Sequence, residues 1–204
     1  MKPIKQIFQT CILLLLLGCF TSCYKNVYYR IDQETKDYCL FDDGSYWMYL
    51  DSATMGINIV SVDGQPSYEM DGFEGFHFEY SRTYFSFYSQ DTTFNYSAAL
   101  NASYSHKKDT IVLLERFDHE AMYHNKNIGY NIQGLELLEI KDSCIINSKK
   151  FYDVKVFKSS RHDKGYYWAK HVGLIREETY SNDSIIAVRN LIQYKVWPYN
   201  IINE

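Results

Sequence analysis

The feature that most constrains the fold is a strict two-residue alternation between residues 93 and 105. Apolar side chains alternate there with small or polar ones, and the apolar set is Phe94, Tyr96, Ala98, Leu100, Ala102 and Tyr104. Successive side chains of a β-strand point to opposite faces, so this period predicts a strand with one apolar face. A strand over 93–105 would be about 40 Å long, which is typical of strongly twisted sheets or barrels.

Shorter alternations recur along the chain, with turn residues between them. The segments predicted as strands are 45–50, 57–62, 76–81, 84–88, 110–117, 135–141, 151–157, 166–169, 173–180 and 185–196. The first two form a hairpin across Ala53 to Gly56, and only Asp118 to Asn125 fits a helical turn. Aromatic residues make up 17% of the chain and favour strands. The sequence therefore predicts a mainly β domain with a single antiparallel, strongly curved sheet or half-barrel.

The N-terminus has the organisation of a secretory signal peptide. Lys2 and Lys5 precede the apolar run Ile12 to Leu17, and small residues lead to Cys23. A membrane-spanning helix needs about 20 apolar residues, so this run is too short to cross a bilayer.

Two cysteines resemble the lipidated residue of bacterial lipoprotein signals. Leu16-Leu17-Gly18-Cys19 matches the general motif, and Phe20-Thr21-Ser22-Cys23 resembles the Ser-Cys ending frequent in Bacteroidetes-type lipoproteins. Processing at Cys19 would leave an odd number of cysteines, which is unfavourable in an oxidising compartment, so we choose Cys23 and keep Cys19 as the alternative. The predicted divisions are a signal peptide over 1–22, a polar, irregular tether over 23–43 and a β-rich domain over 44–204.

The rest of the chain carries a second resemblance. Phe151 to Val154, Tyr166 to Arg176 and Gly44 to Ser52 resemble a pattern that recurs in uncharacterised envelope lipoproteins of the Bacteroidetes type. The resemblance implies a curved antiparallel sheet or half-barrel, and an envelope location. It implies no chemistry.

Cys39 and Cys144 are the two cysteines that remain after processing at Cys23. In an oxidising envelope they could form a disulfide, which would close a loop of about 105 residues and stabilise the fold by ~4–5 kcal/mol in the chain-entropy model. The alternative is a pair of buried thiols that pack as small apolar residues.

Four short motifs match the Asp-Ser/Thr-x pattern on which Bacteroidetes-type envelope proteins carry O-linked glycans. The candidate hydroxyls are Ser52, Thr92, Thr110 and Ser184. Composition alone gives roughly 0.6 such matches by chance for this kind of modification. The same dipeptides are also common where a turn leads into a strand, so a purely structural origin stays open.

Sequence motifs for catalysis are missing. The chain has no Gly-x-Ser-x-Gly, no Gly-rich phosphate loop and no dinucleotide fingerprint, so we expect no enzyme and no cofactor. Asp118, His119, Glu120 and His124 form the densest set of metal-ligand types, but their spacing favours a solvated turn, and no metal is expected. The formal charge of −4 argues against nucleic acid as a partner.

These observations predict a lipid-anchored cell-envelope protein, at the periplasmic or surface face of the outer membrane, with a non-catalytic binding or structural role. A ligand of unknown type would bind a groove lined by Phe94, Tyr96 and Leu100. The alternative is a protein–protein interaction component of an envelope complex, and a weaker one is a glycan-active hydrolase. The aromatic runs are expected to pack in the sheet, with sugar stacking as the alternative; they are Tyr46, Trp47, Tyr49, Tyr166, Tyr167 and Trp168.

Overall fold

A computed structural model gives the architecture. It describes residues 26–31, 33–73, 76–89, 93–102, 110–114, 120–123, 131–132, 135–159 and 163–198. The signal segment and both candidate lipidation residues, Cys19 and Cys23, lie outside the described residues.

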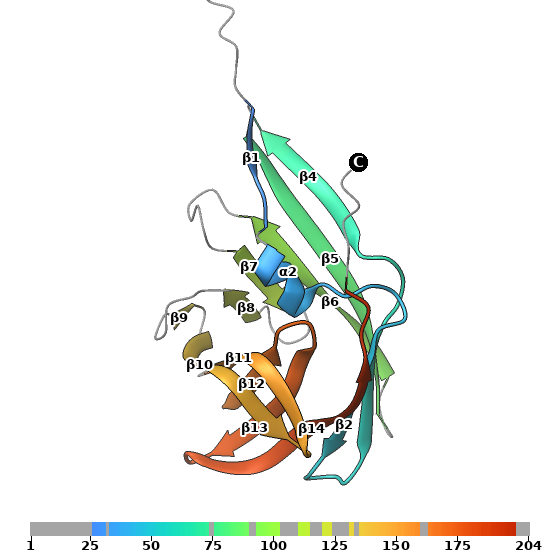
Figure 1. Ribbon diagram of the computed structural model, residues 1–204, viewed down its shortest axis with the longest axis vertical. Helices are drawn as coiled ribbons and strands as arrows, with labels where there is room; N and C mark the ends of the chain where they lie inside the picture. The colour runs from blue at the N-terminus through green and yellow to red at the C-terminus, as the bar shows by residue number, and fades with distance from the viewer. Residues whose placement is uncertain are drawn as a thin grey trace, which may run out of the picture.

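The described chain is built almost wholly of strands, with one short helix near its start (Figure 1). The elements are β1 (Val27–Tyr29), α2 (Gln33–Cys39), β2 (Tyr46–Asp51), β3 (Ile57–Val62), β4 (Ser67–Phe73), β5 (Phe76–Tyr88), β6 (Thr93–Ala102), β7 (Thr110–Leu114), β8 (Glu120–Tyr123), β9 (Asn131–Ile132), β10 (Leu135–Ile146), β11 (Lys149–Ser159), β12 (Lys164–Ala169), β13 (Gly173–Ser181) and β14 (Ser184–Lys195).

All the strands belong to one sheet, whose order is β8-β7-β6-β5-β3-β2-β14-β13-β12-β11-β10-β9. Neighbours along this path are antiparallel, and β2 and β14 meet in its middle although they lie at opposite ends of the sequence. Strands β4 and β1 also pair with the long β5, and the β1–β5 pair is parallel. The pairing of β2 with β14 therefore places a strand from the N-terminal half beside the last strand of the chain.

The prediction of a mainly β, antiparallel domain is confirmed, but the prediction of a strongly curved sheet or half-barrel is wrong. The sheet is open, with β8 and β9 as its ends, and it is not strongly curled. The first ten residues of the segment expected to form a 13-residue strand form β6, and residues 103–105 lie outside the described residues. Strand length alone does not set curl, which depends on bulges and on what packs against each face.

Two tight hairpins in the C-terminal half follow from their turn residues. Asn147 and Ser148 join β10 to β11, and Asn182 and Asp183 join β13 to β14, all four with positive φ. Two consecutive residues with positive φ define the type I′ turn, whose twist matches that of antiparallel strands, and Asn and Asp tolerate this conformation best among residues other than Gly.

Two apolar clusters stabilise the fold. The first cluster joins the two halves of the sheet and consists of Phe41, Trp47, Tyr49, Val60, Val62, Phe85, Phe87, Ile146, Phe151, Val154, Val156, Ala169, Ile175 and Leu191. The second cluster lies under α2 and consists of Ile31, Tyr38, Cys39, Leu40, Leu137, Phe157, Tyr166 and Trp168. Strand β11 serves both, because Val154 and Val156 belong to the first and Phe157 to the second.

The expected irregular tether over residues 23–43 is not what the described part of that segment forms. Residues Val27–Tyr29 pair with β5, Gln33–Cys39 form α2, and the side chains of Ile31, Leu40 and Phe41 are buried. A seven-residue helix is too short for a recognisable helical period, and its stability comes from packing against the sheet. The folded domain therefore begins well before residue 44.

Other predicted elements differ in detail. The predicted helical turn at Asp118 to Asn125 contains the strand β8 instead. The segments 76–81 and 84–88, predicted as two strands, form the single strand β5, and β4 was not predicted. The 45–50 and 57–62 hairpin is confirmed as β2 and β3, with matched register from Tyr46↔Ser61 to Leu50↔Ile57.

Candidate functional site

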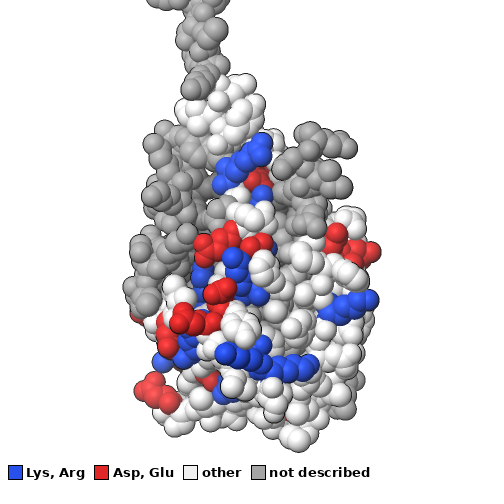
Figure 2. Space-filling model, in the orientation of Figure 1, with Lys and Arg blue, Asp and Glu red and all other residues white. Residues whose placement is uncertain are grey.

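The candidate site is the contact between α2 and the sheet, which we call the α2 joint. Its members are Gln33, Glu34, Lys36, Asp37 and Tyr38 on α2, with Glu79, Asp153, Lys155, Lys170 and His171 on the sheet and its turns. On the face that carries α2, Lys and Arg alternate with Asp and Glu (Figure 2). The joint combines this pairing of opposite charges with the apolar second cluster beneath it.

A buried ion pair connects α2 to the long strand β5. Lys36 Nζ lies 2.6 Å from Glu79 Oε1, and the two side chains are 10% and 1% exposed. The backbone N–H of Ile31 donates to the other carboxylate oxygen of Glu79 at 2.8 Å. Two charged side chains are tolerated in this buried environment because the positive charge of one offsets the negative charge of the other. Loss of one would leave the other buried and unpaired.

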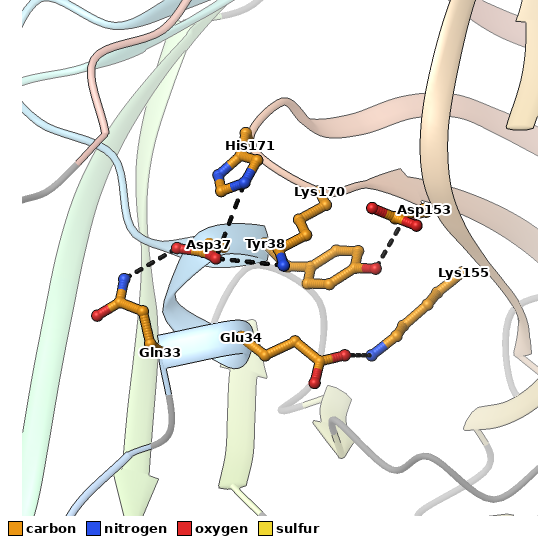
Figure 3. Close-up of polar contacts among 8 residues, drawn as sticks. All are labelled: Gln33, Glu34, Asp37, Tyr38, Asp153, Lys155, Lys170 and His171. Atoms are coloured by element: carbon orange, nitrogen blue, oxygen red, sulfur yellow. Dashed lines mark hydrogen bonds and ion pairs between the residues drawn. The ribbon is translucent and has the colours of Figure 1, made fainter. Parts of the chain in front are cut away.

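A second buried cation, Lys155 of β11, lies beneath the same helix (Figure 3). Its Nζ is 3.5 Å from Glu34 Oε1 and 4.5 Å from the centre of the Tyr38 ring. The Tyr38 hydroxyl donates to the backbone carbonyl of Asp153 at 2.8 Å. Burial, helped by the nearby Asp153 carboxylate, raises the pKa of Tyr38 far above its ordinary value. The ring is therefore held as a neutral hydrogen-bond donor.

Asp37 ties the end of α2 to the β12–β13 turn (Figure 3). Its Oδ1 accepts a hydrogen bond from Gln33 Nε2 at 2.9 Å, and its Oδ2 lies 3.6 Å from Lys170 Nζ and 3.9 Å from His171 Nε2. The backbone N–H of His171 also donates to the Asp37 carbonyl at 2.7 Å. Both the side chain and the backbone of Asp37 therefore hold the end of α2 to the β12–β13 turn.

A second charged group lies across β12, β13 and β14. Glu177 is buried; Lys164 Nζ donates to its Oε1 at 2.7 Å, and the Arg189 guanidinium contacts its Oε2. The register places Glu177 directly opposite Arg189 on neighbouring strands. The Arg189 guanidinium lies 5.5 Å from the centre of the Tyr49 ring, so the cation is also in contact with the first cluster.

The next residue, Glu178, has its own partners. Arg176 Nε donates to Glu178 Oε1 at 2.7 Å, and the Tyr180 hydroxyl donates to Oε2. Burial, with the hydrogen bond to Glu178, raises the pKa of Tyr180 far above its ordinary value. Burial is also the first cause of the raised pKa of Tyr167. Residues 176, 178 and 180 alternate along the strand, so one face of β13 carries this set.

The chemistry of both groups is that of charge pairing. Each of the buried carboxylates of Glu79, Glu177 and Glu178 contacts a cation. The Lys36–Glu79 contact connects α2 to β5, which are distant in sequence. Within the described ranges, no group of three or more His, Cys, Asp or Glu side chains could hold a metal ion. The helix described here is not long and apolar enough to span a membrane.

The predicted disulfide is not formed. Cys39 and Cys144 are both thiols; Cys39 belongs to the second cluster, whereas Cys144 packs against the first. Burial raises the pKa of the Cys144 thiol, which favours its protonated form. The physical reason is placement, because Cys39, the last residue of α2, packs with Leu137 and Phe157 in the second cluster, whereas Cys144 packs against the first.

The four glycosylation candidates stay predictions. Ser52 in the β2–β3 turn and Ser184 at the start of β14 are exposed. The Ser52 Oγ accepts a hydrogen bond from the Val188 N–H at 2.8 Å. Thr92 lies outside the described residues, and Thr110 begins β7 with an undescribed side chain.

The aromatic runs pack mainly in the core, as predicted. Trp47, Tyr49, Tyr166 and Trp168 are buried, and the Tyr49 hydroxyl donates to the Leu174 carbonyl at 2.8 Å. Phe94, Tyr96 and Leu100, the predicted groove residues, lie in β6, whose side chains are outside the described part. The predicted ligand types His119 and His124 also lie outside it, and Glu120 begins β8 with an undescribed side chain.

The charged joint was not predicted from the sequence, although a signal for it exists. Glu79 stands between Phe78 and Tyr80, and Lys155 stands between Val154 and Val156. A charge inside an apolar strand indicates either a solvent-facing position or a buried partner. The sequence alone does not choose between them, because the partners Lys36 and Glu34 come from a distant segment.

Comparison with known proteins finds two solved structures with weak similarity to this chain. No family model and no curated protein matches the chain. A proposed exported protein with a YmcC-like fold from Bacteroides fragilis is 11% identical, with a TM-score of 0.46 over 77% of this chain and 99% of the other. A proposed lipoprotein from Parabacteroides distasonis is also 11% identical, with a TM-score of 0.47 over 78% of this chain and 99% of the other. At these values neither family nor function follows.

Proposed function

We propose that this chain is a lipid-anchored protein of the cell envelope, with a non-catalytic binding or structural role at the membrane surface. The signal-like start and the lipobox-like residues before Cys23 support this location. The observation that carries the proposal is the α2 joint, because it fixes a helix that begins ten positions after Cys23 to the sheet of the domain.

The folded N-terminal segment limits the distance between the domain and an acylated Cys23. Val27, the first residue of β1, is only four positions after Cys23, and a fully extended chain of that length spans at most about 14 Å. The three residues of β1 are paired with β5, and α2 is fixed by the Lys36–Glu79 ion pair. An acylated Cys23 would therefore keep the domain at the bilayer and not on a long flexible stalk.

Acylation supplies enough energy for this anchoring. Each buried methylene contributes about 0.8 kcal/mol, so several acyl chains on one cysteine hold a protein to a membrane without a spanning helix. In this proposal the protein faces the periplasm or the surface of the outer membrane, and its role is to present the β domain there.

The decisive experiment is intact-mass analysis of the protein from its native host, combined with membrane fractionation. We expect a mature chain that starts at Cys23 and carries acyl mass, and a Cys23→Ala variant that loses both processing and acylation. Cys19→Ala is the matched control and should keep both. Loss of acylation in Cys19→Ala but not in Cys23→Ala would move the site to Cys19, and an unacylated wild type would contradict the proposal.

A protein–protein contact is the second candidate function. Met55 and Ile57 at the β2–β3 turn and Ile186 near the start of β14 are exposed, and the Ser52–Val188 hydrogen bonds join these elements. Exposed apolar residues gathered on neighbouring turns are typical of interaction surfaces. A photo-crosslinking residue at position 186 should give a discrete adduct in the native envelope, whereas the same residue at Tyr152, also exposed, should not.

A further inference from the structure

Three strand ends meet at the end of the molecule where the N-terminal chain enters. Val27 pairs with Phe76 in the parallel β1–β5 register, and Phe73 pairs with Phe76 at the close of the β4–β5 hairpin. The first residue of β1, the last residue of β4 and the first residue of β5 are therefore level, and Figure 1 shows them at one extremity of the molecule. We call residues 27–28, 73 and 76–77 the tip.

The described surface of the tip is aromatic and uncharged. Tyr28 is 54% exposed and Val27 is 37% exposed. The Tyr28 ring stacks on His77, with 4.7 Å between ring centroids, which fixes its direction. Figure 2 shows the end of β1 as white, with the nearest blue atoms farther along the molecule. Solvent-exposed apolar and tyrosine side chains held rigidly at an extremity indicate a contact surface.

The path of the chain identifies what this surface meets. Cys23 lies four residues before Val27, so the tip is the part of the described domain that an acylated Cys23 holds within about 14 Å of the bilayer. We propose that the tip is a membrane-contact surface, with Tyr28 and Val27 in the headgroup region of the bilayer and β5 directed away from it. This inference rests on the proposed lipidation at Cys23.

The chemistry of the tip suits an interfacial position. Tyrosine has an apolar ring and a polar hydroxyl and is enriched at membrane–water interfaces. The acyl chains supply the affinity, and the tip fixes the orientation. Strand β5 then provides positions at different distances from the bilayer. His77 is the partner of Tyr28, and Tyr88 lies eleven positions beyond it, about 36 Å farther along the strand.

Two matched substitutions test the orientation in the full-length, acylated protein. Tyr28→Trp places a fluorophore at the tip, and Tyr88→Trp places the same fluorophore on an exposed residue at the far end of β5. Each variant is reconstituted into phosphatidylcholine vesicles whose acyl chains are brominated near the headgroup. Quenching is measured relative to the wild type, which has three tryptophans of its own.

We expect bromolipid to reduce the added fluorescence of Tyr28→Trp by at least twofold and to leave that of Tyr88→Trp unchanged. Equal quenching of both, which means that the domain lies on its side, would overturn the inference, and so would quenching of neither. Should Tyr28→Trp fail to fold, Val27→Trp takes its place with the same expected result.

The failures of the two proposals are distinguishable by mass. If the protein carries acyl mass and floats with the vesicles but the tip probe is not quenched, the orientation is wrong and the lipid anchor stands. If the protein carries no acyl mass and does not float, the lipid anchor is wrong and the orientation fails with it.

Discussion

The two apolar clusters are built on different principles. The first cluster joins strands to strands with side chains such as Val154, Ile175 and Leu191, none of which is exposed. The second cluster joins a short helix to the sheet, and the Lys36–Glu79 ion pair lies beside it. The sheet core is therefore specified by an apolar period of two, whereas the attachment of the N-terminal segment is specified by the pairing of individual charges.

The largest expected effect comes from breaking the attachment. Glu79→Gln keeps a carbonyl oxygen that can accept from the Ile31 N–H but removes the charge, which leaves Lys36 buried without its counter-ion. Breaking a buried ion pair costs roughly 3–5 kcal/mol, and we expect a loss of about 4 kcal/mol in the free energy of unfolding by urea. A loss below about 1 kcal/mol would show that this pair does not hold α2.

A cavity in the first cluster should cost slightly less. Leu191→Ala removes a side chain with no exposed area from the middle of the sheet, and such truncations cost roughly 2–5 kcal/mol, so we expect about 3 kcal/mol by urea unfolding. This loss should not depend on salt, since no charge is removed. If salt changed it markedly, the separation between an apolar core and a charged joint would not hold.

The sequence predicts the strands of the sheet core better than it predicts the N-terminal helix. The β2–β3 hairpin was placed from sequence nearly to the residue, because alternation and a turn mark both of its strands. Helix α2 was missed, since seven residues give no measurable helical period. Strand β4 was missed because Glu69, Asp71 and Gly72 resemble a loop.

The charged joint could not be predicted for a further reason. The partners Lys36 and Glu79 are 43 positions apart in the sequence, and nothing in either local context indicates the other. The same holds for Glu34 and Lys155. Pairings of this kind arise only when the fold brings α2 against the sheet, so the site emerges from tertiary structure.

A smaller effect should come from one hydrogen bond of the joint. Tyr38→Phe keeps the ring over Lys155 and removes the hydroxyl that donates to the Asp153 carbonyl. Loss of such a bond costs about 1 kcal/mol, measurable by urea unfolding at neutral pH. A stability equal to that of the wild type would mean that water replaces the bond without cost.

The same variant should also change the response to alkali. Burial raises the folded-state pKa of Tyr38 above its ordinary value of 10.0, so between these two values the folded chain holds a proton that the unfolded chain has lost. Stability is therefore fully present below about pH 10 and falls as the pH rises above it. Tyr38→Phe should show a shallower fall; an identical slope would contradict the burial of this hydroxyl.

The smallest effect is expected at an exposed ion pair. Lys141 Nζ lies 2.6 Å from Glu139 Oε2, but the glutamate side chain is 54% exposed. Surface pairs contribute about 0–1 kcal/mol, so Glu139→Gln should change the unfolding free energy by less than about 0.5 kcal/mol. It is the matched control for Glu79→Gln, because the chemical change is the same and only the burial differs.

Amide hydrogen exchange on the full-length protein bound to membrane vesicles tests most directly whether α2 belongs to the folded domain. The N–H groups of Ile31, Leu40 and His171 donate to Glu79, to the Lys36 carbonyl and to the Asp37 carbonyl, all within or around the α2 joint. If α2 is an integral part of the domain, these amides should exchange as slowly as those of β2 and β14. Rapid exchange at these three amides, with β2 and β14 still protected, would contradict this and mean that the N-terminal segment is a loose tether.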